Sequence, residues 1–272
     1  MSTTEYIKTQ QKAKKKLRFW TKIIVALTIV AILWTIWAIF TDVIVLRKTE
    51  DMVGSENAIS ILFVGNSHVF VGELPRQLQT IARANDIEII YMDISRHGNR
   101  GGTLSELRER AIIEMQSGRF DYVVLTCNGI RVSNDIDEFL DNVRVLNNEA
   151  IENGVIPVLF NSAWTSDKGR LNIATDAYKL AADEFNIILV NAADAWVYAY
   201  QTIPEVSLIT RFDPRGPHAN RAGGFLSACV FAATLFDLHI DEIPKDNHYK
   251  GNNAIVLAQT AWEFVHPTTT ED

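Results

Sequence analysis

The chain has 272 residues, of which 47% are hydrophobic, and a formal net charge of −7 at pH 7. This length suffices to bury a sizeable core in one large domain. The mild acidity argues against nucleic-acid binding, which requires a basic face.

The N-terminus combines a basic cluster with an apolar segment. Seven basic residues precede position 23, namely Lys8, Lys12, Lys14, Lys15, Lys16, Arg18 and Lys22. The stretch from Ile23 to Phe40 then carries no charge, and as a helix its roughly 18 residues nearly cross a hydrocarbon core. A cleaved signal peptide would need small residues at a cleavage site, which positions 38–43 (AIFTDV) do not offer. We therefore expect an uncleaved transmembrane anchor.

The domain organisation follows from this anchor. Residues 1–22 form a cytoplasmic basic N-terminus, 23–46 the transmembrane signal anchor, 47–57 a polar linker and 58–272 a globular domain. The positive-inside rule places that domain outside the cytoplasm. We thus expect a single-pass protein of the cell membrane.

The globular domain alternates strand and helix patterns. Continuous apolar runs predict strands at 59–65, 87–94, 122–127, 155–160 and 187–190, and apolar residues at helical spacing predict helices near 74–82, 104–115, 136–146, 170–185, 220–237 and 254–265. Strands that are apolar on both faces and separated by amphipathic helices indicate a mostly parallel sheet covered on both sides. The fold class is α/β, a three-layer sandwich.

The first three predicted strands are each followed by unusual polar or glycine-rich residues: Gly65-Asn66-Ser67-His68, residues 96–103, and Asn128-Gly129. In a parallel sheet the ligand site lies at the carboxyl ends of the strands. A serine that follows glycine at a strand-to-helix turn presents its hydroxyl there as a nucleophile. Alternatively, Asn66 or Ser67 only caps the helix that follows.

Four segments resemble the conserved blocks of the SGNH (GDSL-like) hydrolases: ILFVGNSH (61–68), RHGNRGGTLSEL (96–107), VVLTCNG (123–129) and DPRGPHANRAGGFLSA (213–228). The resemblance implies a flavodoxin-like sheet of about five strands, with Ser67 as nucleophile and His218 as its base. It also implies an oxyanion hole made by the backbone N–H groups of Ser67 and Gly101 and by the side chain of Asn128.

The sequence departs from this family pattern at three positions. Asn66 stands where many members carry Asp, and Thr126 replaces a glycine. The family acid usually stands three residues before the histidine, where this chain has Arg215, whereas Asp213 stands five residues before it. We expect Asp213 to complete a triad. The alternatives are a Ser-His dyad oriented by a backbone carbonyl, or an inactive site.

Other polar residues have weaker claims to the site. His97 and Arg215 are candidate substrate contacts, although a structural hydrogen bond is the ordinary explanation for His97 and a solvated loop arginine the ordinary one for Arg215. His68 is expected to point away from the nucleophile. Cys127 and Cys229 lie in apolar runs and are expected to be buried and unpaired. No metal is expected because no His or Cys spacing fits one, and no cofactor because the Gly-rich 98–102 lacks the Lys-Ser/Thr of a P-loop.

The function expected from these features is that of an extracytoplasmic, membrane-anchored serine esterase or deacylase. Its substrate would be an acylated, for example O-acetylated, carbohydrate or another cell-envelope ester. The alternatives are an O-acyltransferase of the same fold and a catalytically degenerate, membrane-tethered binding module.

Overall fold

The computed structural model describes Thr28 and residues 54–97, 100–162, 168–210, 218–241, 244, 247 and 249–267. The predicted anchor at 23–46 and the basic N-terminus lie outside the described residues, Thr28 excepted. No helix within the described ranges is both long and apolar enough to span a membrane. Residues from Gly54 onward form one compact unit, described below.

A parallel sheet forms the centre of this unit. Its strands are β1 (Ile59–Val64), β2 (Ile89–Asp93), β5 (Tyr122–Leu125), β6 (Ile156–Phe160) and β7 (Ile188–Val190). They are ordered β2-β1-β5-β6-β7, and every neighbouring pair is parallel. This is the doubly wound order of flavodoxin-like proteins. The predicted α/β class and five-stranded parallel sheet are confirmed for the described residues.

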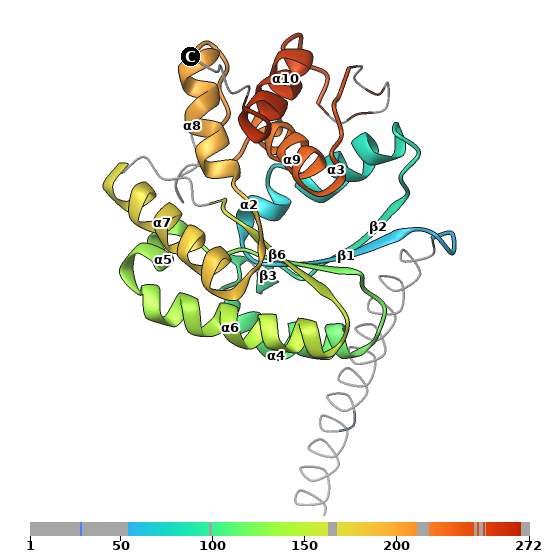
Figure 1. The fold of residues 1–272 in the computed structure, drawn as a ribbon, viewed down its shortest axis with the longest axis vertical. Coiled ribbons are helices and arrows are strands. Elements are labelled where there is room, and N and C mark those ends of the chain that lie inside the picture. The colour runs from blue at the N-terminus through green and yellow to red at the C-terminus, as the bar shows by residue number, and fades with distance from the viewer. Residues whose placement is uncertain are drawn as a thin grey trace, which may run out of the picture. The chain divides into compact units, whose positions relative to one another are not determined.

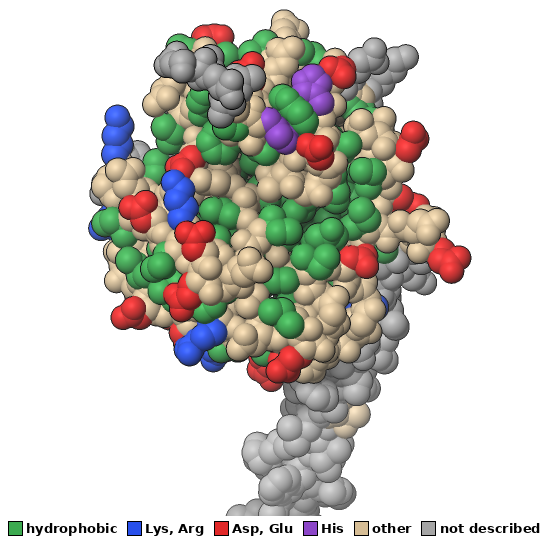
Figure 2. All heavy atoms as spheres, viewed as in Figure 1, with side chains coloured by type: hydrophobic (Ala, Val, Ile, Leu, Met, Phe, Trp, Pro, Cys, Tyr) green, Lys and Arg blue, Asp and Glu red, His purple; other side chains and the backbone are tan. Residues whose placement is uncertain are grey.

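Helices cover both faces of the sheet (Figure 1). On one side lie α3 (Leu74–Arg83), α8 (Ala192–Thr202), α9 (Arg221–Phe236) and α10 (Ala254–Val265), and on the other α4 (Leu104–Gln116), α6 (Ile136–Glu152) and α7 (Lys168–Phe185). Two short helices, α2 (Ser67–Phe70) and α5 (Gly129–Asn134), follow β1 and β5, and β3 (Arg96–His97) pairs with β4 (Arg100–Gly101) in a small hairpin. Figure 2 shows acidic, basic and hydrophobic side chains interspersed over one face of the molecule.

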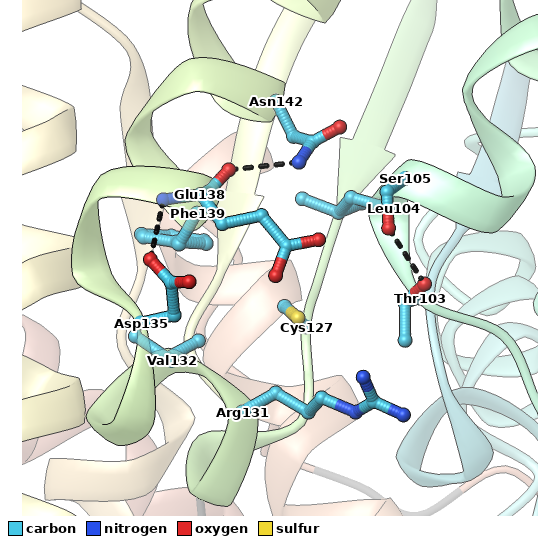
Figure 3. A pocket seen from close by; sticks show the side chains of 10 residues that line it. All are labelled: Thr103, Leu104, Ser105, Cys127, Arg131, Val132, Asp135, Glu138, Phe139 and Asn142. Carbon is cyan, nitrogen blue, oxygen red and sulfur yellow. Dashed lines mark hydrogen bonds between the residues drawn. The ribbon is translucent and has the colours of Figure 1, made fainter.

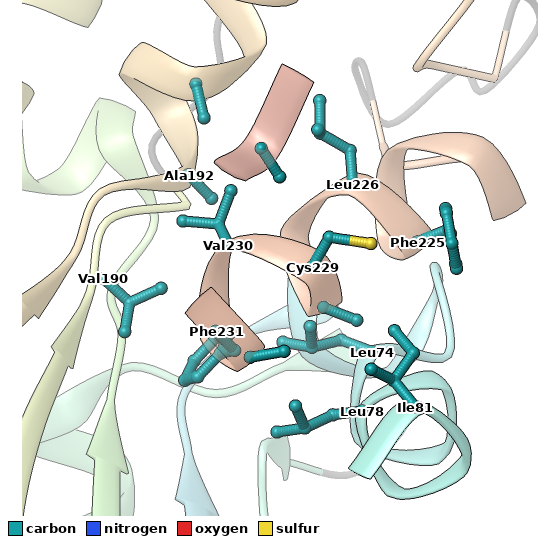
Figure 4. Packing of buried hydrophobic residues seen from close by; sticks show 14 of the residues in the cluster. Leu74, Leu78, Ile81, Val190, Ala192, Phe225, Leu226, Cys229, Val230 and Phe231 are labelled. Atoms are coloured by element: carbon teal, nitrogen blue, oxygen red, sulfur yellow. The ribbon is translucent and has the colours of Figure 1, made fainter. Parts of the chain in front are cut away.

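Helix α9 is the centre of the main hydrophobic core. Most of its residues are buried, because it packs against α3, α8 and α10 as well as the sheet, and such a helix is apolar on every side. Figure 4 shows Leu226, Cys229, Val230 and Phe231 of α9 packing near Leu74 and Leu78 of α3. Cys229 and Cys127 are both buried and free, as predicted.

The N-terminal end of α9 touches the segment between α2 and α3. A Cβ atom placed on Gly224 would lie only 1.9 Å from the carbonyl oxygen of Gly72, so the two backbones can meet only because both residues are glycine. The buried side chain of Gln77 donates hydrogen bonds to the Gly72 carbonyl at 2.8 Å and the Arg221 carbonyl at 3.1 Å. These contacts fix the start of α9 beside the segment that follows Ser67.

Candidate active site

Ser67 and His218 come together at the carboxyl edge of the sheet. Helix α2 begins at Ser67, and the Asn66 side chain caps it by accepting from the His68 N–H at 2.8 Å. The half-buried Ser67 places its Oγ 2.8 Å from Nε2 of His218, whose side chain is 8% exposed. This distance allows the imidazole to accept the hydroxyl proton.

His218 is held by a short backbone ladder just before α9. Thr210 N–H donates to the His218 carbonyl at 2.9 Å, and Ile209 and Ala219 form an antiparallel bridge. Asn220 then caps α9 by accepting from the Gly223 N–H at 2.9 Å. The position of the imidazole therefore depends on that of α9.

Asn128 lies at the same sheet edge as Ser67. Val64 of β1 pairs with Leu125 of β5, and Ser67 and Asn128 each stand three residues beyond that pair. The Asn128 side-chain oxygen accepts from the Ile130 N–H at 3.0 Å and caps α5. Because the oxygen is engaged there, the amide NH₂ is the end that can donate to an oxyanion.

Gly101 lies in the β3-β4 hairpin, which follows β2 in the chain. Strand β2 neighbours β1 on the side away from β5. It pairs with Arg96, and the next residue, Gly102, donates its N–H to the Ser95 carbonyl at 2.8 Å. The Arg96 guanidinium lies 4.0 Å from the ring centroid of Phe70 at the end of α2, a cation-π contact that connects the hairpin to the helix that begins at Ser67. His97 also belongs to β3, but its side chain lies outside the description.

Thr126, the residue that follows β5, packs against the turn before Ser67. Its hydroxyl lies 2.8 Å from Ser162 Oγ. A Cβ on Gly65 would lie 2.1 Å from the Thr126 methyl carbon. The threonine thus occupies space that glycine at position 65 leaves free, and it is a packed structural element of the site.

His68 contacts His218, contrary to the expectation that it would point away. The two rings are stacked with centroids 5.7 Å apart and an interplanar angle of 27°, and Trp196 meets His68 edge-on at 6.5 Å. Burial, and secondarily the neighbouring His218, lowers the pKa of His68 to about 4, so this imidazole is neutral at physiological pH. The sequence did not predict this contact, because it indicated a turn where α2 begins.

A small surface hollow, with about 20 Å³ of space for the centre of a water-sized sphere, lies beside the two segments that carry the oxyanion-hole candidates. Its lining includes Thr103, two residues after Gly101, and Cys127, directly before Asn128, together with Arg131, Glu138, Phe139 and Asn142. Arg131 and Glu138 lie on either side of Cys127 (Figure 3). Asn142 is 4% exposed, and its side-chain oxygen has no hydrogen-bond partner among the described residues.

Two of the predicted site residues lie outside the described residues. Asp213 and Arg215 both belong to the stretch 211–217, so a hydrogen bond between Asp213 and His218 stays a prediction. Within the ranges that the structure describes, no cluster of three or more His, Cys, Asp or Glu side chains could hold a metal ion.

The fold has counterparts among solved structures, whereas the sequence matches no family model and no curated protein. A DUF4886 family protein from Bacteroides uniformis is similar with a TM-score of 0.55 and 14% identity, over 77% of this chain and 95% of that one. The psychrotrophic esterase EstA from a Pseudoalteromonas species, inhibited by monoethylphosphonate in its crystal, has a TM-score of 0.50 and 14% identity over 65% and 97%. A candidate SGNH hydrolase from Slackia heliotrinireducens has a TM-score of 0.49 and 22% identity over 66% and 100%. The described domain thus shares its fold with the DUF4886 family protein and with the esterase EstA.

Proposed function

We propose that the protein is a serine esterase or deacylase that works through an acyl-enzyme on Ser67. The observation that carries this proposal is the distance of 2.8 Å between Ser67 Oγ and His218 Nε2 at the carboxyl edge of the sheet. A nucleophile and a base within hydrogen-bond reach, beside amide and backbone donors, form the minimum machinery of acyl transfer.

The reaction proceeds in two halves. Ser67 Oγ attacks the ester carbonyl while His218 Nε2 takes its proton, and the oxyanion receives hydrogen bonds from the Asn128 amide and the N–H groups of Ser67 and Gly101. The intermediate collapses to the acyl-enzyme, and His218 returns the proton to the leaving alcohol. Water then attacks the acyl-enzyme with His218 again as base, which releases the acid and restores Ser67.

Asp213 is the proposed third member of the site. A carboxylate on the imidazole would keep it in the tautomer whose Nε2 accepts the serine proton. We expect D213N to lower kcat by roughly 100-fold or more with an unchanged KM, whereas R215A should not reduce kcat. Equal activity of D213N and the native chain would show that the site works as a Ser-His dyad without Asp213.

Labelling with a fluorophosphonate probe tests the nucleophile directly. The structural neighbour EstA is inhibited by a phosphonate, which supports a probe of this class. Native protein should be labelled and S67A should not, with S162A as a control for a buried serine close to the site. Labelling that does not depend on Ser67 would exclude the esterase mechanism. Ser67-dependent labelling without turnover of any p-nitrophenyl ester would favour acyl transfer.

The proposed substrate is an O-acetylated carbohydrate or a similar cell-envelope ester. The hollow beside Cys127 supports a hydroxyl-rich alcohol group, since its lining includes the charged side chains of Arg131 and Glu138. Such a lining offers both donors and acceptors to hydroxyl groups.

Substrate choice can be tested with two esters of the same acid. R131A and E138A should raise KM for mono-acetylated methyl glycosides by roughly tenfold, because each removes hydrogen bonds to sugar hydroxyls. Their kcat/KM for p-nitrophenyl acetate should change less than twofold. R144A, at an exposed position on the helix α6 that also carries Glu138, serves as the control. An equal effect on both esters would argue against the glycoside.

We further propose that the domain is anchored outside the cytoplasm by residues 23–46. The support is the uncharged apolar sequence that follows the basic cluster. The full chain should sediment with membranes, resist carbonate extraction and expose residues after 57 to external protease. Release by carbonate would rule out the anchor.

A further inference from the structure

Tyr178 of α7 contacts the loop that leads from β5 to Asn128. Its side chain is fully buried. The hydroxyl accepts a hydrogen bond from the Cys127 N–H at 2.6 Å and donates one to the Cys127 carbonyl at 3.1 Å. A side chain from a distant helix therefore binds both backbone polar groups of the residue directly before Asn128.

These hydrogen bonds lie directly beyond the point where this segment stops pairing with β1. The Thr126 N–H is the last backbone donor of this segment to reach β1, bonding to the Val64 carbonyl at 3.0 Å. Cys127 is 7% exposed, and a buried backbone group left unpaired there would destabilise the fold. Tyr178 supplies both partners in place of a neighbouring strand.

The tyrosine hydroxyl is itself fixed in position and protonation. Its ring packs against Phe139 with centroids 4.7 Å apart. Burial strongly raises the pKa of Tyr178, so the hydroxyl stays protonated and can donate and accept at once. The Thr126 hydroxyl lies 3.5 Å from it and connects it to Ser162.

We propose that Tyr178 is a positioning residue for the oxyanion hole. It holds the backbone before Asn128, while the Ile130 N–H holds the Asn128 side-chain oxygen from the other side. The two contacts together direct the amide NH₂ toward the carbonyl that Ser67 attacks. An oxyanion-hole donor acts only within about 2.7–3.1 Å of the developing charge, so small shifts of this loop reduce catalysis. The inference rests on the proposed esterase function.

A double-mutant cycle in the full-length protein tests this role. Y178F, N128A and the double variant are compared with the native chain in kcat and KM for p-nitrophenyl acetate and in the thermal midpoint. Y178F should lower kcat roughly 10- to 100-fold with KM within twofold, since it weakens a donor used in the transition state. In the N128A background the same substitution should change kcat less than twofold. Y198F, which loses a hydroxyl contact with the surface residue Glu263, should behave as the native chain.

Each outcome decides the proposal. If Y178F lowers kcat equally with and without Asn128, the tyrosine is merely structural and the proposal is overturned. An unchanged kcat in Y178F would also overturn the proposal. If Y178F fails to fold, 3-fluorotyrosine at position 178 keeps both hydrogen bonds and alters their strength. Its change in kcat should then disappear in N128A, and persistence there would overturn the inference. A native chain without Ser67-dependent labelling or turnover would instead refute the esterase function, and the role of Tyr178 with it.

Discussion

The imidazole rings of His68 and His218 lie stacked with their centroids 5.7 Å apart. One ring is placed to accept the proton of Ser67, and the other is a buried neutral group on the helix that Ser67 begins. The neutral ring can pack against the base without adding a competing charge.

Burial of His68 predicts acid sensitivity of the fold. Its pKa falls from about 6.5 in the unfolded chain to about 4 in the folded one, so the unfolded state binds the proton more readily between these values. The contribution of neutral His68 to the unfolding free energy is therefore complete above pH 6.5 and is lost as the pH falls toward 4. Native protein should lose roughly 2 kcal/mol more than H68F between pH 7.5 and pH 5. Urea unfolding at both pH values measures this difference.

The control for this experiment is H239Q, at a surface position where the side chain is 43% exposed. It should show the same pH dependence between pH 7.5 and pH 5 as the native chain to within about 0.5 kcal/mol. An H68F protein that is as acid-sensitive as the native chain would refute the assignment to His68.

Ser67 and His218 should act as one unit. S67A and H218N are each expected to lower kcat at least about 10³-fold, and the double variant should be no worse than either alone, since each removes the same reaction path. Ester turnover under single-turnover conditions measures all three. Multiplicative losses in the double variant would show that the two residues do not share a proton.

Gly224 should determine the geometry of the site through α9. The methyl group of G224A cannot fit 1.9 Å from the Gly72 carbonyl, so the helix must move away. We expect a loss of about 1–3 kcal/mol in unfolding free energy, and a loss of activity because the distance between Ser67 and His218 grows. A232G, which weakens the same helix elsewhere by about 1 kcal/mol, should stay active. If both variants retain full activity, the glycine contact does not position His218.

Gly65 and Thr126 should be coupled in stability. G65A should cost about 2 kcal/mol in the native background, since its methyl group would overlap that of Thr126. In a T126G background the cost should fall by about 1 kcal/mol and not vanish, because the Thr126 carbonyl also lies 2.8 Å from the added Cβ. Equal costs in both backgrounds, measured by urea unfolding, would contradict the coupling.

Much of the fold follows from local sequence. The strands are continuous apolar runs because both faces of the sheet are covered, and β2 falls inside the predicted stretch 87–94. The helix predicted at 254–265 has the bounds of α10. Helix α8 was missed, since its buried positions are largely alanines, whose small side chains give a weak periodic signal. The β3-β4 hairpin lies in a Gly-rich stretch that suggested only a loop.

The sequence predicted those site residues whose positions follow from the order of the strands along the chain. Ser67, Asn128 and Gly101 follow adjacent strands, so the sheet brings them to one edge. The direction of His68 was wrong because a helix that starts at Ser67 turns the next side chain by about 100°, into the core. Tyr178 gave no signal, since its partner is backbone 51 residues away. The role of Asp213 as the acid of the triad remains a prediction.

Ser67 and His218 are separated by 151 positions in the chain, and they meet only when α9 has docked against α3. A nascent chain that has already completed β1 and β5 therefore lacks its base until almost the entire domain has left the ribosome. Contacts of such long range slow folding, because a long loop must close before they can form. Catalysis, once established, would thus report the docking of α9 and stay silent for every species in which His218 has not reached Ser67.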